Sequence, residues 1–272
     1  ASGTVSFLGS LPEAKGAREL LQAAASHPRP AVRSAALRVL GLRSEAWGDA
    51  IIAEKLTDAD PGVLANAVRS LARRLPEGAF EKVLPLLFHA REEVRNRALE
   101  SLPYLARPTD VALLERLLLE TEPGERLLAY VEVSRRLERG PFVGAWLSRI
   151  PGAPPDLLRG LLRALSEETG PEVTASLRPL LDHPEPAIRT LVIECLAHPA
   201  NAAEIGPLLK ARLRADPECV YYVVRALGRL RYAAAAGDLM AFYPSAAPLE
   251  KVAIVEAVGA LGTPEGARFL EA

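Results

Sequence analysis

The sequence contains few cysteines and no long apolar run. Its two cysteines cannot form a disulfide framework, and no Cys-x-x-Cys or paired His/Cys spacing indicates a zinc site. No stretch of about 18 consecutive apolar residues is present, and the opening ASGTVSFLGS lacks the basic segment and apolar run of a signal peptide. We therefore expect a chain, or a piece of one, that is soluble, cytoplasmic and not inserted in a membrane.

Neither sign of charge is in excess. The chain has 33 lysine and arginine residues against 34 aspartate and glutamate residues, for a net charge of −1. A surface devoted to nucleic acid or to anionic lipid usually leaves a basic excess. Any basic binding face must therefore be local.

What the sequence does have is a repeat. We call the residue two positions after a recurring proline the anchor of its unit; successive anchors lie 31 residues apart, except for one step of 32. The proline is present in seven of the eight units, and Glu92 replaces it in the other. The anchors are Val32, Val63, Val94, Glu125, Leu157, Ile188, Cys219 and Glu250. A fixed period of this length is typical of repeat architectures.

Each unit is predicted to be helix, turn, helix. A proline just before an apolar periodic run belongs in the first turn of a helix, where its missing N–H would have no partner anyway. Apolar residues recur at the anchor and four, five and eight positions later, which is one face of a helix. No segment alternates as a strand does. Because one such unit cannot bury its apolar face alone, we predict an all-α fold, an α-solenoid of about eight 31-residue units.

The run that follows the proline resembles the HEAT repeat, in the short bacterial form shared with phycobilin-lyase subunits. The residues that carry the resemblance best are Pro30, Val32, Arg33, Ala36, Leu40 and Gly41. It covers nearly the whole chain and implies a single repeat domain over residues 1–272. The closing GTPEGARFLEA is similar to LPEAKGARELLQ near the N-terminus, so we expect a fragment that stops inside a ninth repeat.

The sequence has no recognisable catalytic or phosphate-binding motif. The chain has no Gly-rich phosphate loop, no His-Glu-x-x-His and no nucleophile elbow. His27, His89 and His183 stand at one repeat position in separate units, too far apart for one metal ion, so we expect them to cap turns. Cys195 and Cys219 fall at or near apolar stripes, where thiols are buried and inert. We expect neither enzymatic activity nor a metal or cofactor.

A basic residue follows the anchor in five units: Arg33, Arg95, Arg126, Arg189 and Lys251. In the HEAT pattern this residue lies at the edge of the core and ties one repeat to an acidic turn residue of its neighbour. Here the acidic partners are predicted to be residues such as Asp58 or Asp182.

The solvent face of the second helices is predicted to line the concave side of the solenoid. Helical geometry assigns to it the positions two, three, six and ten after the anchor. The basic residues there are Arg38, Arg69, Arg73, Arg97, Arg135, Arg159, Arg163, Arg225 and Arg229, against Glu100, Glu167, Glu194 and Glu256. Tyr104, Tyr221 and Tyr222 are interleaved with them. Arginine and tyrosine are enriched at binding hot spots, so this face is either a partner site or a merely solvated surface.

The fourth unit breaks the pattern. Glu125 stands at its anchor, whereas Leu127, Leu128 and Val131 occupy positions that should be polar. Either this helix is rotated and buries both stripes, or the three residues form an exposed apolar patch rimmed by Arg97, Arg135, Arg159 and Arg163.

These observations favour a non-catalytic scaffold or adaptor that binds an acidic or amphipathic segment of a protein partner, whether a separate protein or another domain of the same polypeptide. One alternative is a nucleic-acid-binding protein similar to the HEAT-like alkylpurine glycosylases, although both tryptophans fall on first helices away from the concave face. Another is a subunit similar to phycobilin lyases, although nothing marks a bilin pocket. Of the three, we expect the protein partner.

Overall fold

A computed structural model describes residues 16–271, and every regular element within that range is a helix. The prediction of an all-α fold is confirmed. The segment ASGTVSFLGS and the first residues of LPEAKGARELLQ lie outside the described range. No helix in the part of the chain that the structure describes combines the length and the apolar character needed to cross a bilayer.

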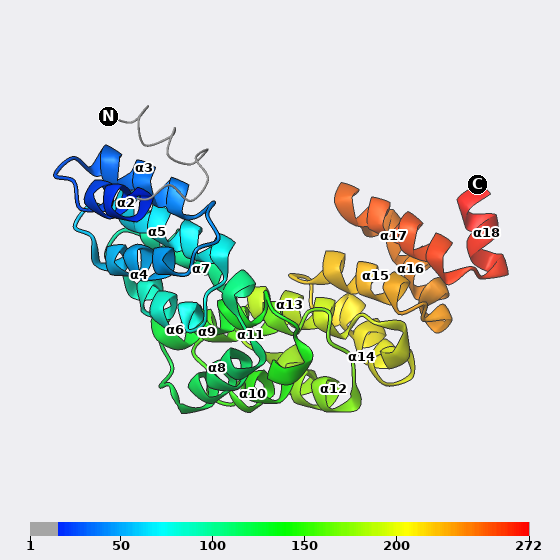
Figure 1. Cartoon of the computed structure of the whole chain (residues 1–272). Helices are drawn as coiled ribbons and strands as arrows, with labels where there is room; N and C mark the ends of the chain where they lie inside the picture. The colour runs from blue at the N-terminus through cyan, green and yellow to red at the C-terminus, as the bar shows by residue number, and fades with distance from the viewer. Residues whose placement is uncertain (1–15, 272) are drawn as a thin grey trace. The chain divides into compact units, whose positions relative to one another are not determined.

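The chain folds as two compact units, with the boundary between Pro141 and Phe142 (Figure 1). The first unit holds α2 (Ala17–Ala25), α3 (Pro30–Leu40), α4 (Trp47–Glu54), α5 (Pro61–Arg74), α6 (Ala79–Val83), α7 (Glu92–Leu105), α8 (Pro108–Glu120) and α9 (Glu125–Ser134). The second holds α10 (Val143–Ser148), α11 (Pro155–Ala164), α12 (Pro171–Leu177), α13 (Pro186–Leu196), α14 (Ala202–Ala215), α15 (Val220–Arg229), α16 (Ala236–Phe242), α17 (Pro248–Leu261) and α18 (Pro264–Glu271).

Short 3-10 turns extend or connect several of these helices. They are η1 (Lys55–Thr57), η2 (Leu84–Phe88), η3 (Gly140–Phe142), η4 (Arg178–Asp182), η5 (Pro199–Asn201), η6 (Ala233–Ala235) and η7 (Tyr243–Ser245). Each of η2, η4, η5 and η7 has a proline in its first turn. Four of them, η1, η2, η4 and η7, directly follow a first helix, whereas η3, η5 and η6 directly precede one.

The recurring proline starts a helix in most repeats, as predicted. Pro30, Pro61, Pro155, Pro186 and Pro248 are the first residues of α3, α5, α11, α13 and α17. After Pro123 and Pro217 the helix begins two to three residues later, at Glu125 and Val220. We call the odd-numbered helices α3 to α17 the second helices, and the even-numbered ones the first helices.

Second helices pack side by side within each unit: α3 on α5 and α5 on α7 in the first, α11 on α13, α13 on α15 and α15 on α17 in the second. The anchor residues Val32, Val63, Val94, Leu157, Ile188 and Cys219 are all buried between the two layers. Because each helix buries its stripe against its neighbours in the array, the core runs continuously along each unit.

Small residues let consecutive second helices approach closely. The residue seven after the anchor faces the preceding helix, where Ser70 donates to the Leu37 carbonyl at 2.9 Å and Cys195 to the Leu162 carbonyl at 3.2 Å. On the preceding helix, the residue nine after the anchor lies opposite this small side chain. A Cβ atom on Gly228 would come within 2.9 Å of the Ala257 Cα, and one on Gly41 within 2.8 Å of the Ser70 Oγ.

The two thiols are buried in this core, as expected. Burial raises the pKa of the Cys195 thiol to about 12, and burial also raises the pKa of Cys219. Both cysteines are free. A thiol that stays protonated is a weak nucleophile, which agrees with a packing role.

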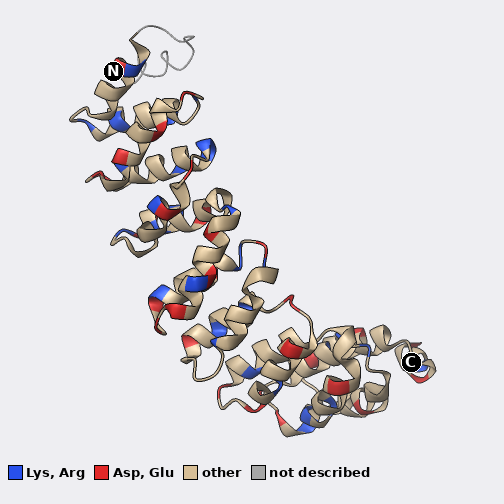
Figure 2. Ribbon diagram, turned by 60° about the horizontal axis from the view of Figure 1, so that its bottom comes forward, with Lys and Arg blue, Asp and Glu red and all other residues tan. Residues whose placement is uncertain are grey.

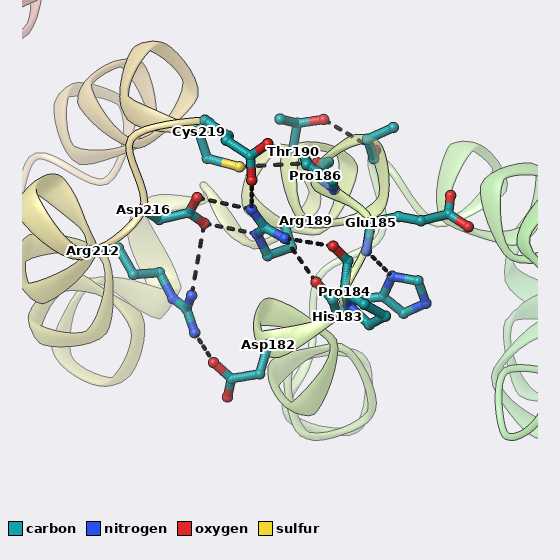
Figure 3. A network of polar contacts seen from close by, with 12 residues as sticks. Asp182, His183, Pro184, Glu185, Pro186, Arg189, Thr190, Arg212, Asp216 and Cys219 are labelled. Atoms are coloured by element: carbon teal, nitrogen blue, oxygen red, sulfur yellow. Dashed lines mark hydrogen bonds and ion pairs between the residues drawn. The ribbon is translucent and has the colours of Figure 1, made fainter.

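Arginines that follow the anchor tie one repeat to the next in two places. Arg33 makes a paired hydrogen bond to Asp58 at 2.7 and 2.8 Å, and Arg189 does the same to Asp216 at 2.8 and 2.9 Å. Figure 3 shows Arg189 also reaching the carbonyl oxygens of His183 and Pro184. Each guanidinium therefore closes its own turn and holds the next one.

The expected partner Asp58 is confirmed, and the expected partner Asp182 is wrong. Asp182 belongs to the same repeat as Arg189 and pairs with Arg212 of α14 instead (Figure 3). The other members of the series act differently: Arg95 holds only the carbonyls of its own turn, Arg126 lies 5.1 Å from the Phe88 ring centre, and Lys251 lies 5.4 Å from that of Tyr243.

The three equivalent histidines cap turns, as predicted. Nδ1 of His27, His89 and His183 accepts a hydrogen bond from the backbone N–H two residues later, at 3.0 to 3.1 Å. The ring thus shapes the turn that leads into each second helix. No group of three metal-binding side chains occurs among the described residues.

We predict that Gly228→Val destabilises the protein by about 2 kcal/mol, because the new side chain would overlap the backbone of α17. Gly237→Val is the matched control, since Gly237 is also helical and nothing lies within 4 Å of the place that its Cβ atom would take. Urea unfolding followed by circular dichroism measures both. Equal effects at the two glycines would contradict the close packing of α15 on α17.

We predict that Arg189→Gln destabilises the protein by about 3 kcal/mol at neutral pH, because the buried Asp216 carboxylate loses two short hydrogen bonds and keeps, of its ion pairs, only the longer one to Arg212 at 3.9 Å. Hydrogen bonds from Arg189 hold the pKa of Asp216 below its ordinary value. A carboxylate of lowered pKa stabilises the fold above its unfolded pKa, and this contribution is lost as the pH falls through the folded pKa. The difference in unfolding free energy between wild type and variant should therefore shrink once the pH falls below the unfolded pKa of aspartate, about 3.9. A measurement near pH 3 should show a smaller difference than one at pH 7.

Arg178→Gln is the control for this pair. Arg178 and Glu204 are 3.4 Å apart and both about half exposed, so breaking that pair should cost about 0.5 kcal/mol or less. A loss for Arg189→Gln that does not vary with pH would contradict the role given to Asp216.

Candidate partner-binding surface

The exposed line of each second helix is narrower than the sequence indicated. Of the four positions assigned to the solvent face, those six and ten after the anchor are exposed in most repeats, whereas those two and three after it are mostly half-buried by neighbouring helices. We call the residues at the sixth and tenth positions the second-helix ridge. Any partner that docks on this face meets the ridge first.

In the first unit the ridge is basic and carries two large exposed side chains. Arg38 of α3 and Arg69 and Arg73 of α5 are exposed, and none of them has a carboxylate partner among the described residues. Leu42, just past the end of α3, is 75% exposed, and Tyr104 of α7 is 74% exposed. The surface thus combines uncompensated positive charge with apolar and aromatic groups.

These side chains are neighbours because their helices are neighbours. Helices α3, α5 and α7 pack in sequence, and packed helices lie about 8 to 10 Å apart. Arg69 and Arg73 are four residues apart on one helix, which puts them on the same face. Glu100 is the acidic residue in this stretch of the ridge, and Arg97 pairs with it at 2.7 Å.

In the second unit the ridge alternates in sign. Arg163, Arg225 and Arg229 are exposed, and the same line holds Glu167, Glu194 and Glu256. A hollow of about 500 Å³ lies here, lined by His198, Arg225, Arg229, Arg231 and Glu256 among others. Arg225 stacks on Tyr221 at 5.5 Å, and Tyr221 meets Tyr222 edge-on at 5.4 Å, so both tyrosines are half-buried supports.

Three of the arginines predicted to contact a partner are already paired within the chain. Arg97 binds Glu100; Arg135 makes two bonds of 2.6 Å to Glu132; Arg159 binds Asp156 at 2.6 Å and Glu185 at 3.0 Å. The hydrogen bond to Glu132 raises the pKa of Arg135, and that to Asp156 raises the pKa of Arg159. Their charge is largely compensated, which distinguishes them from Arg163 and Arg225.

The exposed apolar patch considered for the fourth repeat is not present. Leu127 and Val131 are 0% and 1% exposed, and Leu128 is half-buried. The anchor Glu125 is exposed instead, so the helix has turned about its axis relative to the other second helices and buries both stripes. Leu127 and Val131 are therefore core residues and leave the set of partner-binding candidates.

The charges of the whole chain are mixed. Figure 2 shows lysine and arginine interspersed with aspartate and glutamate along both units. The basic character of the first-unit ridge is thus a local feature, as the near-zero net charge requires.

Residues 49–133 match the family model described as HEAT repeats. This segment holds HEAT repeats. It runs from α4 into α9, and a recurring proline and a buried stripe like those of this segment are also found in repeats outside it. No curated protein sequence matches the chain.

Solved structures share the solenoid fold at low sequence identity. YibA of Escherichia coli has a TM-score of 0.55 and 13% identity, with 95% of each chain covered. Importin beta has a TM-score of 0.60 and 13% identity, with 96% of this chain and 42% of that chain covered. The karyopherin Kap121p, bound to the extreme C-terminus of the phosphatase Cdc14p, has a TM-score of 0.55 and 14% identity, with 92% and 38% covered.

Leu42 is a surface residue that the sequence reasoning missed. It stands ten after the first anchor, on the predicted face, but the apolar residues predicted to be exposed on that face were those of the fourth repeat. Counting large apolar residues at ridge positions would have found it.

We predict that Arg69→Gln changes the free energy of unfolding by about 0.5 kcal/mol or less, because Arg69 is exposed and unpaired. Arg74→Gln in the same helix should cost about 3 kcal/mol. Its guanidinium is buried, pairs with Asp49 and donates to the carbonyls of Leu40, Arg43 and Glu45. Denaturant unfolding measures both variants. Similar losses of unfolding free energy at the two sites would argue against a ridge that is free for a partner.

Proposed function

We propose that this chain is a non-catalytic interaction scaffold, and that the first-unit ridge binds an acidic or amphipathic segment of a partner protein. The observation that carries the proposal is the set of exposed, unpaired arginines on consecutive helices, Arg38, Arg69 and Arg73, flanked by Leu42 and Tyr104. A scaffold of HEAT repeats fits this role, and the Kap121p structure holds a peptide segment of another protein.

Charge and shape both favour an acidic segment. Exposed arginines without acceptors are solvated, so binding a carboxylate replaces water without first breaking an internal ion pair. Arg and Tyr are enriched at binding hot spots, and an exposed leucine beside them offers an apolar contact. A segment with acidic residues around one or two apolar ones satisfies all of these groups together.

The second unit offers a smaller contribution. Arg163 and Arg225 are exposed and have no carboxylate partner among the described residues, and the Arg225 guanidinium lies over the Tyr221 ring. Three glutamates on the same ridge reduce the local positive charge. We propose that this surface is selective for a segment of mixed charge. The main site for an acidic segment is the first-unit ridge. The proposal takes the protein as a cytoplasmic one, in keeping with its two free thiols.

The test is selection of peptides from a random display library against the purified protein. We expect the recovered peptides to be rich in aspartate and glutamate around leucine or an aromatic residue. A variant with Arg38→Glu, Arg69→Glu and Arg73→Glu should lose this binding, since the ridge then repels the acidic peptide. Binding to wild type should weaken as salt rises, because the contacts are solvent-exposed charges.

The matched control makes the same change of charge on the first helices. Arg18, Lys82 and Arg116 are exposed there, and replacing all three by glutamate should leave peptide binding intact. Equal loss in both variants would show that net charge, not the ridge, governs binding. Tight, steeply salt-dependent binding of duplex DNA with no peptide selected would favour the nucleic-acid alternative.

A further inference from the structure

The second helix α17 has apolar residues exposed along one face. On α17, Leu249 is 74% exposed, Val252 is 57% exposed and Val255 is 40% exposed, and Gly259 beside them is exposed as well. Four residues of α17 therefore form a continuous apolar strip, which we call the end face. It lies apart from the arginines of the proposed partner site and is explained by neither the core nor the ridge.

The equivalent residues of earlier repeats show what belongs on such a strip. Val255 stands five after its anchor, and in five earlier repeats the residues at that position, Leu37, Val68, Leu162, Ile193 and Val224, are 0% exposed. Gly259 stands nine after its anchor, and its counterparts Gly41 and Gly228 are buried. At these two positions the strip is thus buried in the named repeats, each of which another second helix follows, whereas the counterparts of Leu249, such as Ala31 and Ala187, are exposed.

The contacts identify the covering element in those repeats. Ser70 of α5 bonds to the Leu37 carbonyl of α3, and Cys195 of α13 to the Leu162 carbonyl of α11, so the residue seven after an anchor lies over the strip of the preceding helix. At the glycine positions, Ser70 lies over Gly41 and Ala257 lies over Gly228. A second helix with a small residue at that place is the occupant that this geometry takes.

Helix α18 already has the position of a first helix. It packs on both α16 and α17, as α4 packs on both α2 and α3. Phe269 meets Tyr243 edge-on at 5.3 Å, and Leu270, 43% exposed, approaches the end face beside Gly259. Elsewhere in the array a first helix is followed by a second helix that covers the strip.

We propose that the end face of α17 is the docking surface for the second helix of a ninth repeat, whose first helix is α18. Its recognition is apolar and steric: branched side chains of the occupant meet Val252 and Val255, and a small residue, alanine or serine, fits over Gly259. The proposal depends on the repeat geometry and not on the proposed function of the ridge.

The experiment extends the chain after Ala272 with a copy of residues 242–262, which reproduces the register of 31. This copy carries a helix that is known to fit a glycine, because Ala257 of α17 packs over Gly228. We expect the extension to raise the melting temperature by several degrees. A Val255→Cys reporter should be labelled by a thiol reagent at least about tenfold more slowly in the extended protein, since labelling would then require local opening.

Gly259→Leu supplies the matched control. In the unextended protein this position is exposed, and the nearest group to an added Cβ is the end of the Leu270 side chain at 3.7 Å, so the substitution should leave the melting temperature unchanged or raise it. In the extended protein it blocks the close approach, so both the thermal gain and the protection of Val255→Cys should disappear.

Three results would overturn the proposal. The extension could leave melting temperature and labelling unchanged, or Gly259→Leu could leave its effects intact. The unextended protein could also form a dimer that Val255→Asp abolishes, in which case the occupant is a second copy of this chain. Analytical sedimentation measures whether the unextended protein is a dimer. Circular dichroism of Val255→Asp checks that this variant is a folded monomer and not an unfolded chain.

Discussion

The close approach of neighbouring second helices is the constraint on which the rest of the structure depends. A side chain of one or two heavy atoms, Ser70, Cys195 or Ala257, stands where α5, α13 and α17 cross their predecessors, and in two of these places it lies over a glycine. At this spacing the branched residues of adjacent helices interdigitate and bury one another completely. The anchors of these repeats, such as Val63 and Ile188, are buried in the resulting core.

The arginines divide into two classes by whether the protein itself supplies an acceptor. Arg33, Arg74 and Arg189 are buried against carboxylates and carbonyl oxygens, so their charge is compensated within the fold. Arg38, Arg69 and Arg73 have no such acceptor among the described residues and remain in water. The difference between a structural and an available guanidinium lies in its neighbours, which a composition or a position in the repeat does not reveal.

The sequence was sufficient to predict the fold and much of its polar detail. The proline period placed the second helices, the repeat position of the histidines predicted their turns, and Asp58 was correctly named as one acidic partner of the arginines that follow the anchors. It was not sufficient for the fourth repeat, where the rotation of α9 depends on how Leu127 and Val131 pack. Nor could it separate Arg135 from Arg225, because the pairing with Glu132 depends on side-chain geometry within one turn of helix.

The separation of the two arginine classes has an evolutionary consequence. A residue such as Arg69 contributes little to folding, so it can be exchanged without loss of the protein, whereas Arg189 and Asp216 can change only together. The charge of the ridge can then change by single substitutions, each tolerated by an unchanged frame. Substitutions at exposed positions such as Arg69 alter the surface and leave the packed helices below it as they are.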